Sequence, residues 1–184
     1  MASVLVPLAQ GCEELEAVTI VDLLRRAGIE VITAGLDAQP ITASRGMRLL
    51  ADMALDQALE NDYDMVVLPG GLPGADHLDQ DSRIRALLQK MLTEKKYIAA
   101  ICAAPKVLAS AGLLDGRKAT SFPGSLDACN ITGMDYREQA VVIDGPVITS
   151  RGPGTAMDFA LTLIEVLLGK EKRAEVEAPL QRPH

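Results

Sequence analysis

One cysteine of this chain stands where a catalytic nucleophile would be expected. Cys102 ends an apolar stretch and has only small close neighbours, Ala99-Ala100 before it and Ala103-Ala104 after it. Small neighbours leave room for an abrupt turn from a strand into a helix. A thiol at a helix N-terminus gains thiolate character, with pKa values of about 3.5–7.5. The pattern therefore favours a reactive thiol over a buried structural cysteine.

Glu16 is the candidate proton partner of this thiol. It lies in the first turn of a helix predicted from Leu15 to Ala27, where acidic residues usually compensate the helix dipole at the surface. That interpretation suffices for Glu13 and Glu14. Glu16 falls nearly one turn further round the helix, so we expect it to face Cys102. Desolvation and a neighbouring thiolate would then raise its pKa, and it could pass a proton to the thiol or to a substrate.

A glycine pair, Gly70-Gly71, follows an apolar strand. The pair matches neither a Walker loop nor the dinucleotide-binding fingerprint, so phosphate binding is disfavoured, and a simple strand-ending turn is the alternative. Beside the Cys102 elbow, however, the backbone N–H groups of Gly71 and Ala103 could form an oxyanion hole for a tetrahedral intermediate.

Length and charge narrow the class of protein. The chain has 184 residues and a formal net charge of −7, and only 3% of its residues are aromatic. We expect one domain over residues 1–184, in which residues 170–184 form a solvated C-terminal extension. An acidic chain with few aromatic rings is a poor match for nucleic acid or for an anionic membrane surface. It has no apolar run of about 18 residues and no basic N-terminal region, which indicates a cytoplasmic location.

The remaining cysteines and the histidines predict neither disulfides nor a metal site. The chain has an odd number of cysteines, Cys12, Cys102 and Cys129, and they lack CxxC spacing. Its two histidines are His77 and the last residue, His184. Free thiols are therefore expected, with Cys12 and Cys129 as small core residues rather than auxiliary redox groups. A zinc site would lack ligands, and we expect no metal and no cofactor.

Short apolar runs alternate with amphipathic helical stretches, which is typical of βα units on a parallel sheet. Strands are predicted at Ser3–Leu8, Ile29–Ala34, Tyr63–Leu68 and Tyr97–Ile101, and a hairpin with an Asp144-Gly145 turn at Val141–Ile143 and Val147–Thr149. Helices are predicted at Leu15–Ala27, at Leu55–Leu59, around Ile84–Leu92, from Cys102 to Ala111 and around Ala156–Leu167. The stretch from Gly35 to Asp52 is predicted to be a loop with short extended pieces.

This order places the candidate residues together. The segments that begin at Gly11, Leu68 and Ile101 each follow a predicted parallel strand. Ligands of open α/β sheets gather outside the carboxyl ends of such strands, so the three segments are expected to share one cleft.

Several motifs that extend over essentially the whole chain resemble the ThiJ/PfpI superfamily, in particular the subgroup of the parkinsonism-linked deglycase and the bacterial YajL-like proteins. They are Glu13-Glu14-Leu15-Glu16, Asp22-Leu23-Leu24-Arg25-Arg26-Ala27-Gly28, Ser44-Arg45-Gly46, Val67-Leu68-Pro69-Gly70-Gly71, Ala99-Ala100-Ile101-Cys102-Ala103-Ala104-Pro105 and Thr149-Ser150-Arg151-Gly152-Pro153-Gly154-Thr155.

The resemblance implies an α/β, flavodoxin-like (class I glutamine-amidotransferase-like) three-layer sandwich with a mostly parallel central sheet, and a homodimer. It implies Cys102 as the reactive elbow cysteine, Glu16 as its protonated partner, and Gly71 and Ala103 as the oxyanion donors. By the same resemblance, substrate-binding positions are Arg26, Arg45 and Pro153, with Arg26 reaching the pocket of the partner subunit.

One departure from the family pattern bears on mechanism. Many members carry a histidine directly after the cysteine or about twenty residues later, and here those positions are Ala103 and Phe122. A Cys-His-acid triad would have to recruit His77, so peptidase activity is disfavoured.

Two functions remain open from the sequence. In the first, the chain is a cofactor-free hydrolase or lyase of 2-oxoaldehydes such as methylglyoxal and glyoxal, or a deglycase of their early adducts on proteins. In the second, it is a peroxide sensor or redox-regulated chaperone that works through oxidation of Cys102. Both functions require an accessible thiol of low pKa, and so the sequence does not separate them.

Overall fold

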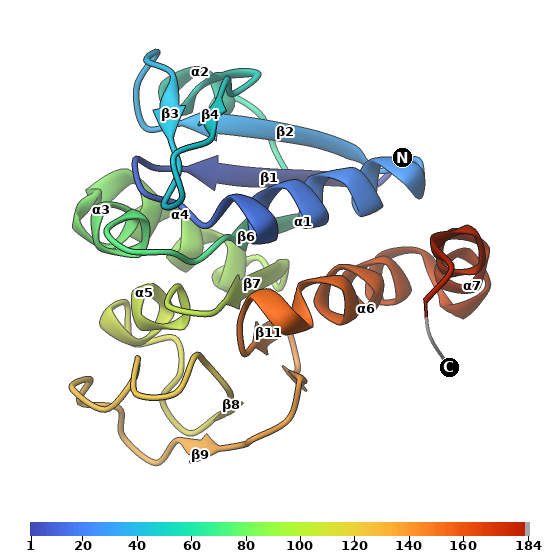
Figure 1. The fold of residues 1–184 in the computed structure, drawn as a ribbon. Coiled ribbons are helices and arrows are strands. Elements are labelled where there is room, and N and C mark those ends of the chain that lie inside the picture. The colour runs from blue at the N-terminus through green and yellow to red at the C-terminus, as the bar shows by residue number, and fades with distance from the viewer. Residues whose placement is uncertain (183–184) are drawn as a thin grey trace.

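The computed structural model describes residues 1–182, and its central layer is a seven-stranded sheet (Figure 1). Its strands are β1 (Ser3–Leu8), β2 (Glu30–Gly35), β5 (Met53–Ala54), β6 (Met65–Leu68), β7 (Tyr97–Ile101), β10 (Val141–Asp144) and β11 (Val147–Ser150). Their order across the sheet is β10-β11-β7-β6-β1-β2-β5, and all neighbours are parallel except β10 and β11. The predicted mostly parallel sheet is confirmed.

Helices cover both faces of the sheet and complete the predicted three-layer sandwich. They are α1 (Glu14–Arg26), α2 (Leu55–Ala58), α3 (Gly74–Gln80), α4 (Ser82–Thr93), α5 (Pro105–Ser110), α6 (Ala156–Leu168) and α7 (Lys170–Glu177). Alternate residues of β1 point to opposite faces, as a strand requires. Val4 and Val6 pack with apolar residues of α1 and α6, whereas Leu5 packs with those of α4 and α5. Over residues 1–182, no helix is long and apolar enough to cross a membrane.

Two short pairs of strands lie outside the main sheet. β3 (Ile41–Thr42) and β4 (Arg48–Leu49) are antiparallel and account for the predicted extended pieces after β2. β8 (Lys118–Ala119) and β9 (Asp135–Tyr136) are parallel. The predicted hairpin is confirmed as β10 and β11, in which Asp144 pairs with Val147 and Gly145 adopts a positive φ of 58°.

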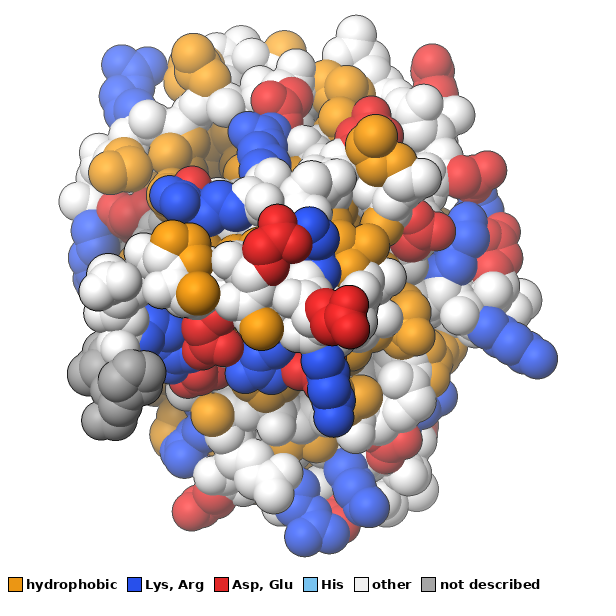
Figure 2. All heavy atoms as spheres, turned by 90° about the vertical axis from the view of Figure 1, so that its right-hand side faces the viewer, with side chains coloured by type: hydrophobic (Ala, Val, Ile, Leu, Met, Phe, Trp, Pro, Cys, Tyr) orange, Lys and Arg blue, Asp and Glu red, His pale blue; other side chains and the backbone are white. Residues whose placement is uncertain are grey.

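The structure differs from the sequence-based prediction in two segments. Helix α3 was not predicted, since its seven residues are too short to show a clear periodicity. The segment after Lys170 was predicted to be solvated, but it forms α7, which packs on α6. Val176 is only 4% exposed, and Arg173 forms an ion pair of 2.7 Å with Glu165 of α6. Figure 2 looks onto this side of the molecule, where basic and acidic side chains are interspersed. His184 lies outside the described residues.

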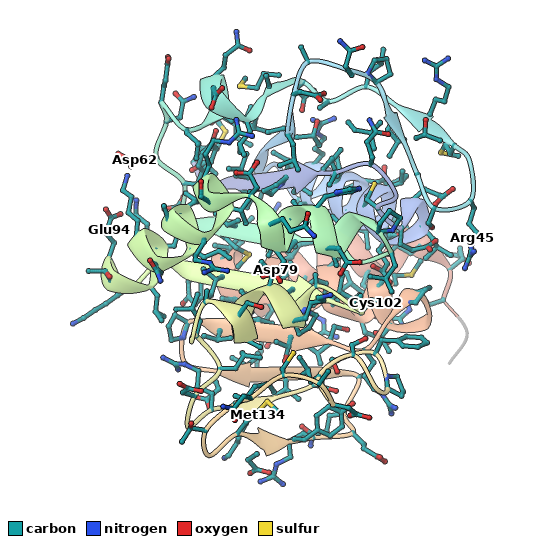
Figure 3. The ribbon with its side chains drawn as sticks, turned by 90° about the vertical axis from the view of Figure 1, so that its left-hand side faces the viewer. Arg45, Asp62, Asp79, Glu94, Cys102 and Met134 are labelled. Atoms are coloured by element: carbon teal, nitrogen blue, oxygen red, sulfur yellow. The ribbon has the colours of Figure 1, made fainter. Side chains whose placement is uncertain are left out.

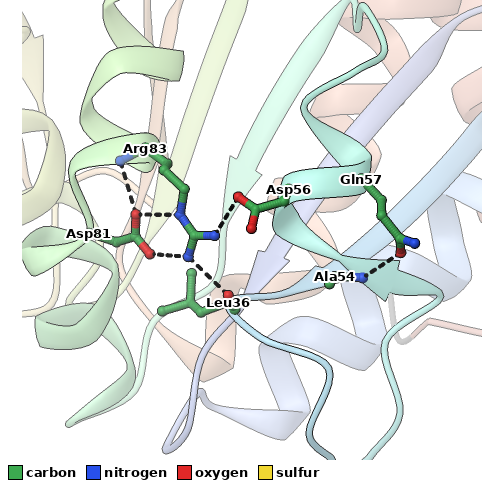
Figure 4. Close-up of polar contacts among 6 residues, drawn as sticks. All are labelled: Leu36, Ala54, Asp56, Gln57, Asp81 and Arg83. Atoms are coloured by element: carbon green, nitrogen blue, oxygen red, sulfur yellow. Dashed lines mark hydrogen bonds and ion pairs between the residues drawn. The ribbon is translucent and has the colours of Figure 1, made fainter.

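A single arginine joins three elements near the carboxyl end of β2. The guanidinium of Arg83 forms ion pairs with Asp81 at 2.6 Å and with Asp56 of α2 at 2.7 Å, and it donates a hydrogen bond of 2.9 Å to the Leu36 carbonyl oxygen (Figure 4). The hydrogen bonds that Arg83 donates to both carboxylates raise its pKa above the usual range. The start of α4 is thereby fixed to α2 and to the chain that leaves β2.

Candidate active site

Cys102 occupies a strained elbow between β7 and α5, as the sequence predicted. Its backbone is in the left-handed region, with a φ of 64°, directly after the last residue of β7 and three residues before Pro105 begins α5. Residues other than glycine rarely adopt this conformation, which costs roughly 1–2 kcal/mol and is characteristic of functional sites. The Cys102 N–H donates to the Ser150 carbonyl oxygen at 3.0 Å, which ties the elbow to the end of β11. In Figure 3, Cys102 and Arg45 lie toward one side of the molecule, and Asp62 and Glu94 lie toward the other.

Glu16 lies beside this thiol and is fully buried. Its Oε2 accepts a hydrogen bond of 2.8 Å from the Gly70 N–H, whereas its Oε1 accepts none within the described part of the chain. The Cys102 thiol is close enough that each side chain perturbs the pKa of the other. Burial raises the pKa of Glu16 to about 7, and the hydrogen bond from Gly70 and the nearby Cys102 thiol oppose this only in part. The carboxyl group is therefore able to hold a proton near neutral pH.

The pKa of Cys102 corrects the expectation of a thiol activated by a helix N-terminus. Burial and an ionised Glu16 raise the pKa of this thiol to about 12, although the backbone N–H groups of Gly71 and Ala103 act in the opposite direction. Helix α5 has only six residues and begins three residues after Cys102, so its dipole does not offset the effects of burial and of Glu16 on the thiol pKa. A protonated Glu16 removes the repulsion and can donate a hydrogen bond to sulfur, so a neutral Glu16 favours the thiolate at Cys102.

Of the glycine pair, Gly70 lies against the Cys102 and Glu16 side chains, and Gly71 lies against the backbone of residues 11–13. A Cβ atom at Gly70 would lie 2.6 Å from the Cys102 Cβ and 2.8 Å from the Glu16 Oε2. Gly71 has a φ of 87°, and a Cβ atom there would lie 2.4 Å from the Glu13 backbone nitrogen. Neither position has room for a side chain. The backbone N–H of Gly71 acts to lower the pKa of the Cys102 thiol.

A pocket of about 350 Å³ opens above the sulfur, and residues from several loops line it. They are Glu13, Ser44, Arg45, Gly71, Leu72, Cys102, Ala103, Phe122, Ser125 and Pro153. The structure thus brings Arg45 and Pro153 to the predicted site. Arg26 is not at the pocket of its own chain. It is the last residue of α1, and its half-exposed side chain pairs with Asp22 at 2.7 Å.

Two residues that we interpreted as exposed are in fact buried. Glu13 and Glu14 are each only 9% exposed, because the loop after β3 covers them. The Ser44 Oγ lies 2.7 Å from a Glu13 carboxylate oxygen and 3.1 Å from one of Glu14, and the Arg45 N–H donates to Glu14 at 2.9 Å. Burial alone would raise the pKa of Glu14, but the backbone hydrogen bonds, including those from Arg45 and Met47, outweigh it and lower that pKa. These carboxylates hold the loop that forms one rim of the pocket.

Sequence reasoning also missed the apolar rim. Leu72 and Phe122 line the pocket and are 60% and 49% exposed. The Phe122 N–H donates to the Cys102 carbonyl oxygen at 2.8 Å, which fixes this residue beside Cys102. The available signal was the family position itself, where many members place a histidine and this chain has Phe122.

The other residues that the sequence singled out lie apart from this pocket. His77 lines a separate depression with Gln10 and Asp37. Cys12 is fully buried, and burial and Glu14 raise its pKa to about 11. Cys129 is partly buried, its Sγ lies 3.9 Å from the Ser125 carbonyl oxygen, and burial raises its pKa. Cys102 is therefore the thiol that the geometry equips for chemistry.

Comparison with known proteins agrees with this description. The chain is 45% identical over 180 residues to the "Parkinson disease protein 7 homolog" of Danio rerio, which covers 96% of this chain and 95% of that protein. It is 36% identical over 179 residues to the "Glutathione-independent glyoxalase DJR-1.2" of Caenorhabditis elegans, with 97% and 95% covered. The crystal structure of Drosophila melanogaster DJ-1beta superposes with a TM-score of 0.94 at 43% identity and covers 100% of this chain and 99% of that one.

Some relatives are much longer. The chain spans 39% and 46% of the length of two Arabidopsis thaliana relatives, Protein DJ-1 homolog B and Protein DJ-1 homolog A. The resemblance drawn from the motifs is nevertheless confirmed over most of the chain, since the model of the DJ-1/PfpI family matches residues 2–166. The chain belongs to the DJ-1/PfpI family.

Proposed function

We propose that this protein converts 2-oxoaldehydes such as methylglyoxal and glyoxal into 2-hydroxy acids with Cys102 as the nucleophile and without a cofactor. One observation carries the proposal. Glu16 is fully buried, its pKa is raised to about 7, and its Oε1 accepts no hydrogen bond within residues 1–182, although it belongs to the carboxyl group beside the Cys102 thiol. The name of the Caenorhabditis elegans relative, a glutathione-independent glyoxalase, supports the same reaction class.

The first step is addition of sulfur to the aldehyde. Glu16 takes the thiol proton, the Cys102 sulfur bonds to the aldehyde carbon, and Glu16 passes the proton to the aldehyde oxygen. This step gives a hemithioacetal and leaves Glu16 ionised for the next step. The N–H groups of Gly71 and Ala103, which face the sulfur, are placed to stabilise the oxygen that gains negative charge. Arg45 at the rim supplies further hydrogen-bond donors for the second oxygen of the substrate.

The second step moves a proton between the two carbons. An ionised Glu16 removes the proton from the former aldehyde carbon to give an enediol, and the same carboxyl group returns a proton to the adjacent carbon. The product is a 2-hydroxyacyl thioester of Cys102. Water then hydrolyses the thioester, so that one molecule of 2-oxoaldehyde and one of water give one 2-hydroxy acid and the free thiol. A carboxyl pKa near neutrality suits this double role.

The same chemistry extends to early glycation adducts. Hemithioacetals and aminocarbinols on protein side chains contain the same former aldehyde carbon or release the free aldehyde. Exposed residues such as Leu72 and Phe122 line the pocket, so an adduct at the surface of another protein could approach it. The proposal therefore includes a deglycase activity on these adducts. Removal of free 2-oxoaldehydes or of their adducts would in either case protect against carbonyl and oxidative stress.

The test is lactate production from methylglyoxal without glutathione, in enzyme kept reduced. We expect turnover in the wild type and none in Cys102→Ser. The matched control is Cys129→Ser, which removes a partly buried thiol outside the pocket and should retain full activity. Circular dichroism and thermal unfolding verify that each variant is folded. Turnover in Cys102→Ser would assign the nucleophile elsewhere, and a wild type without turnover would refute the enzymatic proposal.

A second function is favoured by the same buried oxygen. If peroxide oxidises Cys102 to a sulfinate, a protonated Glu16 Oε1 can donate a hydrogen bond to it, because no other described group occupies that oxygen. The protein would then act as a redox sensor or redox-regulated chaperone. Intact mass after limiting peroxide treatment tests this function. We expect selective addition of two oxygen atoms at Cys102 and a smaller yield in Glu16→Gln.

We further propose a cytoplasmic homodimer. Leu15 and Val18 on α1 and Leu50 after β4 are exposed apolar side chains. Arg26 at the end of α1 is half-exposed and would leave its ion pair with Asp22 to reach the pocket of a partner subunit. Sedimentation equilibrium tests the dimer, and a charge substitution at Val18 is expected to give monomers.

A further inference from the structure

The pocket is larger and more apolar on one side than methylglyoxal requires. Its volume of about 350 Å³ is in the range of pockets that enclose drug-sized ligands, and a three-carbon aldehyde fills a small part of it. Its lining includes the polar residues Glu13, Ser44 and Arg45. It also includes Leu72 and Phe122, which are exposed although their side chains are apolar.

The Phe122 ring is held in a defined place at this rim. Its backbone N–H donates to the Cys102 carbonyl oxygen at 2.8 Å, and its carbonyl oxygen accepts from the Ser125 N–H at 3.0 Å and from the Ser121 Oγ at 2.9 Å. The preceding residue is also fixed, since the Tyr136 hydroxyl donates to the Ser121 carbonyl oxygen at 3.2 Å. The half-exposed ring is therefore presented by a fixed backbone rather than by a loose loop.

Gly152 allows the ring and the sulfur to lie close together. A Cβ atom at Gly152 would lie 3.3 Å from the Phe122 Cδ2 and 3.9 Å from the Cys102 Sγ. One glycine thus separates the aromatic ring from the nucleophile. A substrate bonded to the sulfur through its aldehyde carbon would carry its ketone substituent into the space beside this ring.

We propose that Phe122 selects 2-oxoaldehydes with an aryl substituent on the ketone carbon, for which phenylglyoxal is the probe. This inference rests on the proposed function and names its preferred substrate class. Sulfur adds to the aldehyde carbon, the proton moves from that carbon to the ketone carbon, and water releases the acid. One molecule of phenylglyoxal and one of water give one of mandelate, with no net oxidation.

The physical basis is the uncovered face of the ring. A methyl substituent leaves Phe122 and Leu72 in water, whereas an aryl substituent covers both and stacks on the ring. Beyond the effect of the buried area, an aromatic pair of this kind changes an equilibrium constant or a rate ratio by roughly 3- to 10-fold. The preference belongs to Phe122 as a specificity-determining residue, since the bond-making atoms are the same for both substrates.

The first experiment compares kcat/KM for phenylglyoxal and methylglyoxal. We expect the wild type to favour phenylglyoxal, and the ratio to fall about 3- to 10-fold in Phe122→Ala and Phe122→Leu but to persist in Phe122→Tyr, which keeps the ring. The matched control is Ile143→Ala, because Ile143 is as exposed as Phe122 but lies outside the pocket. An unchanged ratio in both ring-deleting variants, or an equal fall in the control, overturns the proposal.

The second experiment needs no turnover and so separates this inference from the proposed function. Phenacyl bromide and bromoacetone alkylate the Cys102 sulfur with loss of bromide, and each rate is divided by that of a free thiol. We expect the wild type to favour the aryl reagent by about 3- to 10-fold and Phe122→Leu to lose this preference. A preference without turnover would refute the oxoaldehyde proposal alone. Equal normalised rates for the two reagents in the wild type would overturn the aryl selectivity.

Discussion

Glu16→Gln should change the stability of the protein in a way that depends on pH. Burial raises the pKa of Glu16 from 4.5 to about 7. Between these values the folded protein keeps a proton that the unfolded chain releases, so the free energy of unfolding falls as the pH rises through this window. Each pKa unit corresponds to about 1.36 kcal/mol, and the cost of ionising Glu16 therefore reaches about 3 kcal/mol above neutral pH.

The glutamine variant removes this cost and keeps the shape of the side chain. Its amide oxygen can accept from the Gly70 N–H as Glu16 does, and its amide nitrogen can donate to the Cys102 sulfur. We expect the difference in unfolding free energy between variant and wild type to grow by about 2–3 kcal/mol, in favour of the variant, from about pH 5 to about pH 8. Any loss from imperfect packing is present at both pH values and cancels.

Urea unfolding at the two pH values, followed by circular dichroism, measures this difference. Glu60→Gln is the matched control, since Glu60 is exposed and its replacement should leave the pH dependence of the wild type unchanged. A difference for Glu16→Gln that does not vary with pH would show that the carboxyl group is not forced to carry its charge in a buried site. A variant that loses stability relative to wild type as the pH rises would reverse the sign and refute the argument.

Three further outcomes test other parts of the site and the core. The pKa of Cys102 should fall by about one to two units from its value of about 12 in Glu16→Gln, because a charged neighbour is removed, and the pH dependence of iodoacetamide labelling measures it. Gly71→Ala should destabilise the fold and slow labelling of Cys102, because at a φ of 87° a Cβ atom would lie 2.4 Å from the Glu13 nitrogen. Wild-type labelling kinetics and thermal stability in this variant would contradict the assigned contact. Phe159→Ala should lower the free energy of unfolding by about 3–5 kcal/mol in urea titrations, because Phe159 is fully buried, and a loss below about 1 kcal/mol would mean that the core closes around the cavity.

The sequence predicted the elbow and the sheet because both depend on local patterns. The run of small residues around Cys102 marks a sharp turn, and the alternation of strands and helices determines which loops meet. The positive φ of Cys102 and the burial of Glu16 agree with those predictions. The sequence could not give the pKa of the thiol, because that value depends on the ionisation of Glu16 and on the burial of both groups.

Other features escaped prediction because they depend on contacts between distant segments. Glu13 and Glu14 have the spacing of exposed first-turn acids, and only the loop that carries Ser44, about thirty residues later, buries them. Likewise, the charged sequence of α7 predicts a solvated tail, whereas the structure buries Val176 and pairs Arg173 with Glu165 of α6.

The backbone of Cys102 is strained, and the chemistry proposed for this position would explain why the fold tolerates that strain. At a φ of 64°, glycine would satisfy the turn without a steric penalty, so the cysteine side chain makes the native state about 1 kcal/mol less stable than it needs to be. Selection for stability alone would therefore replace Cys102 with glycine. A lineage that loses the need for the thiol is expected to lose the residue quickly, and a glycine at this elbow in a relative would mark a protein that keeps the fold but has abandoned the reaction.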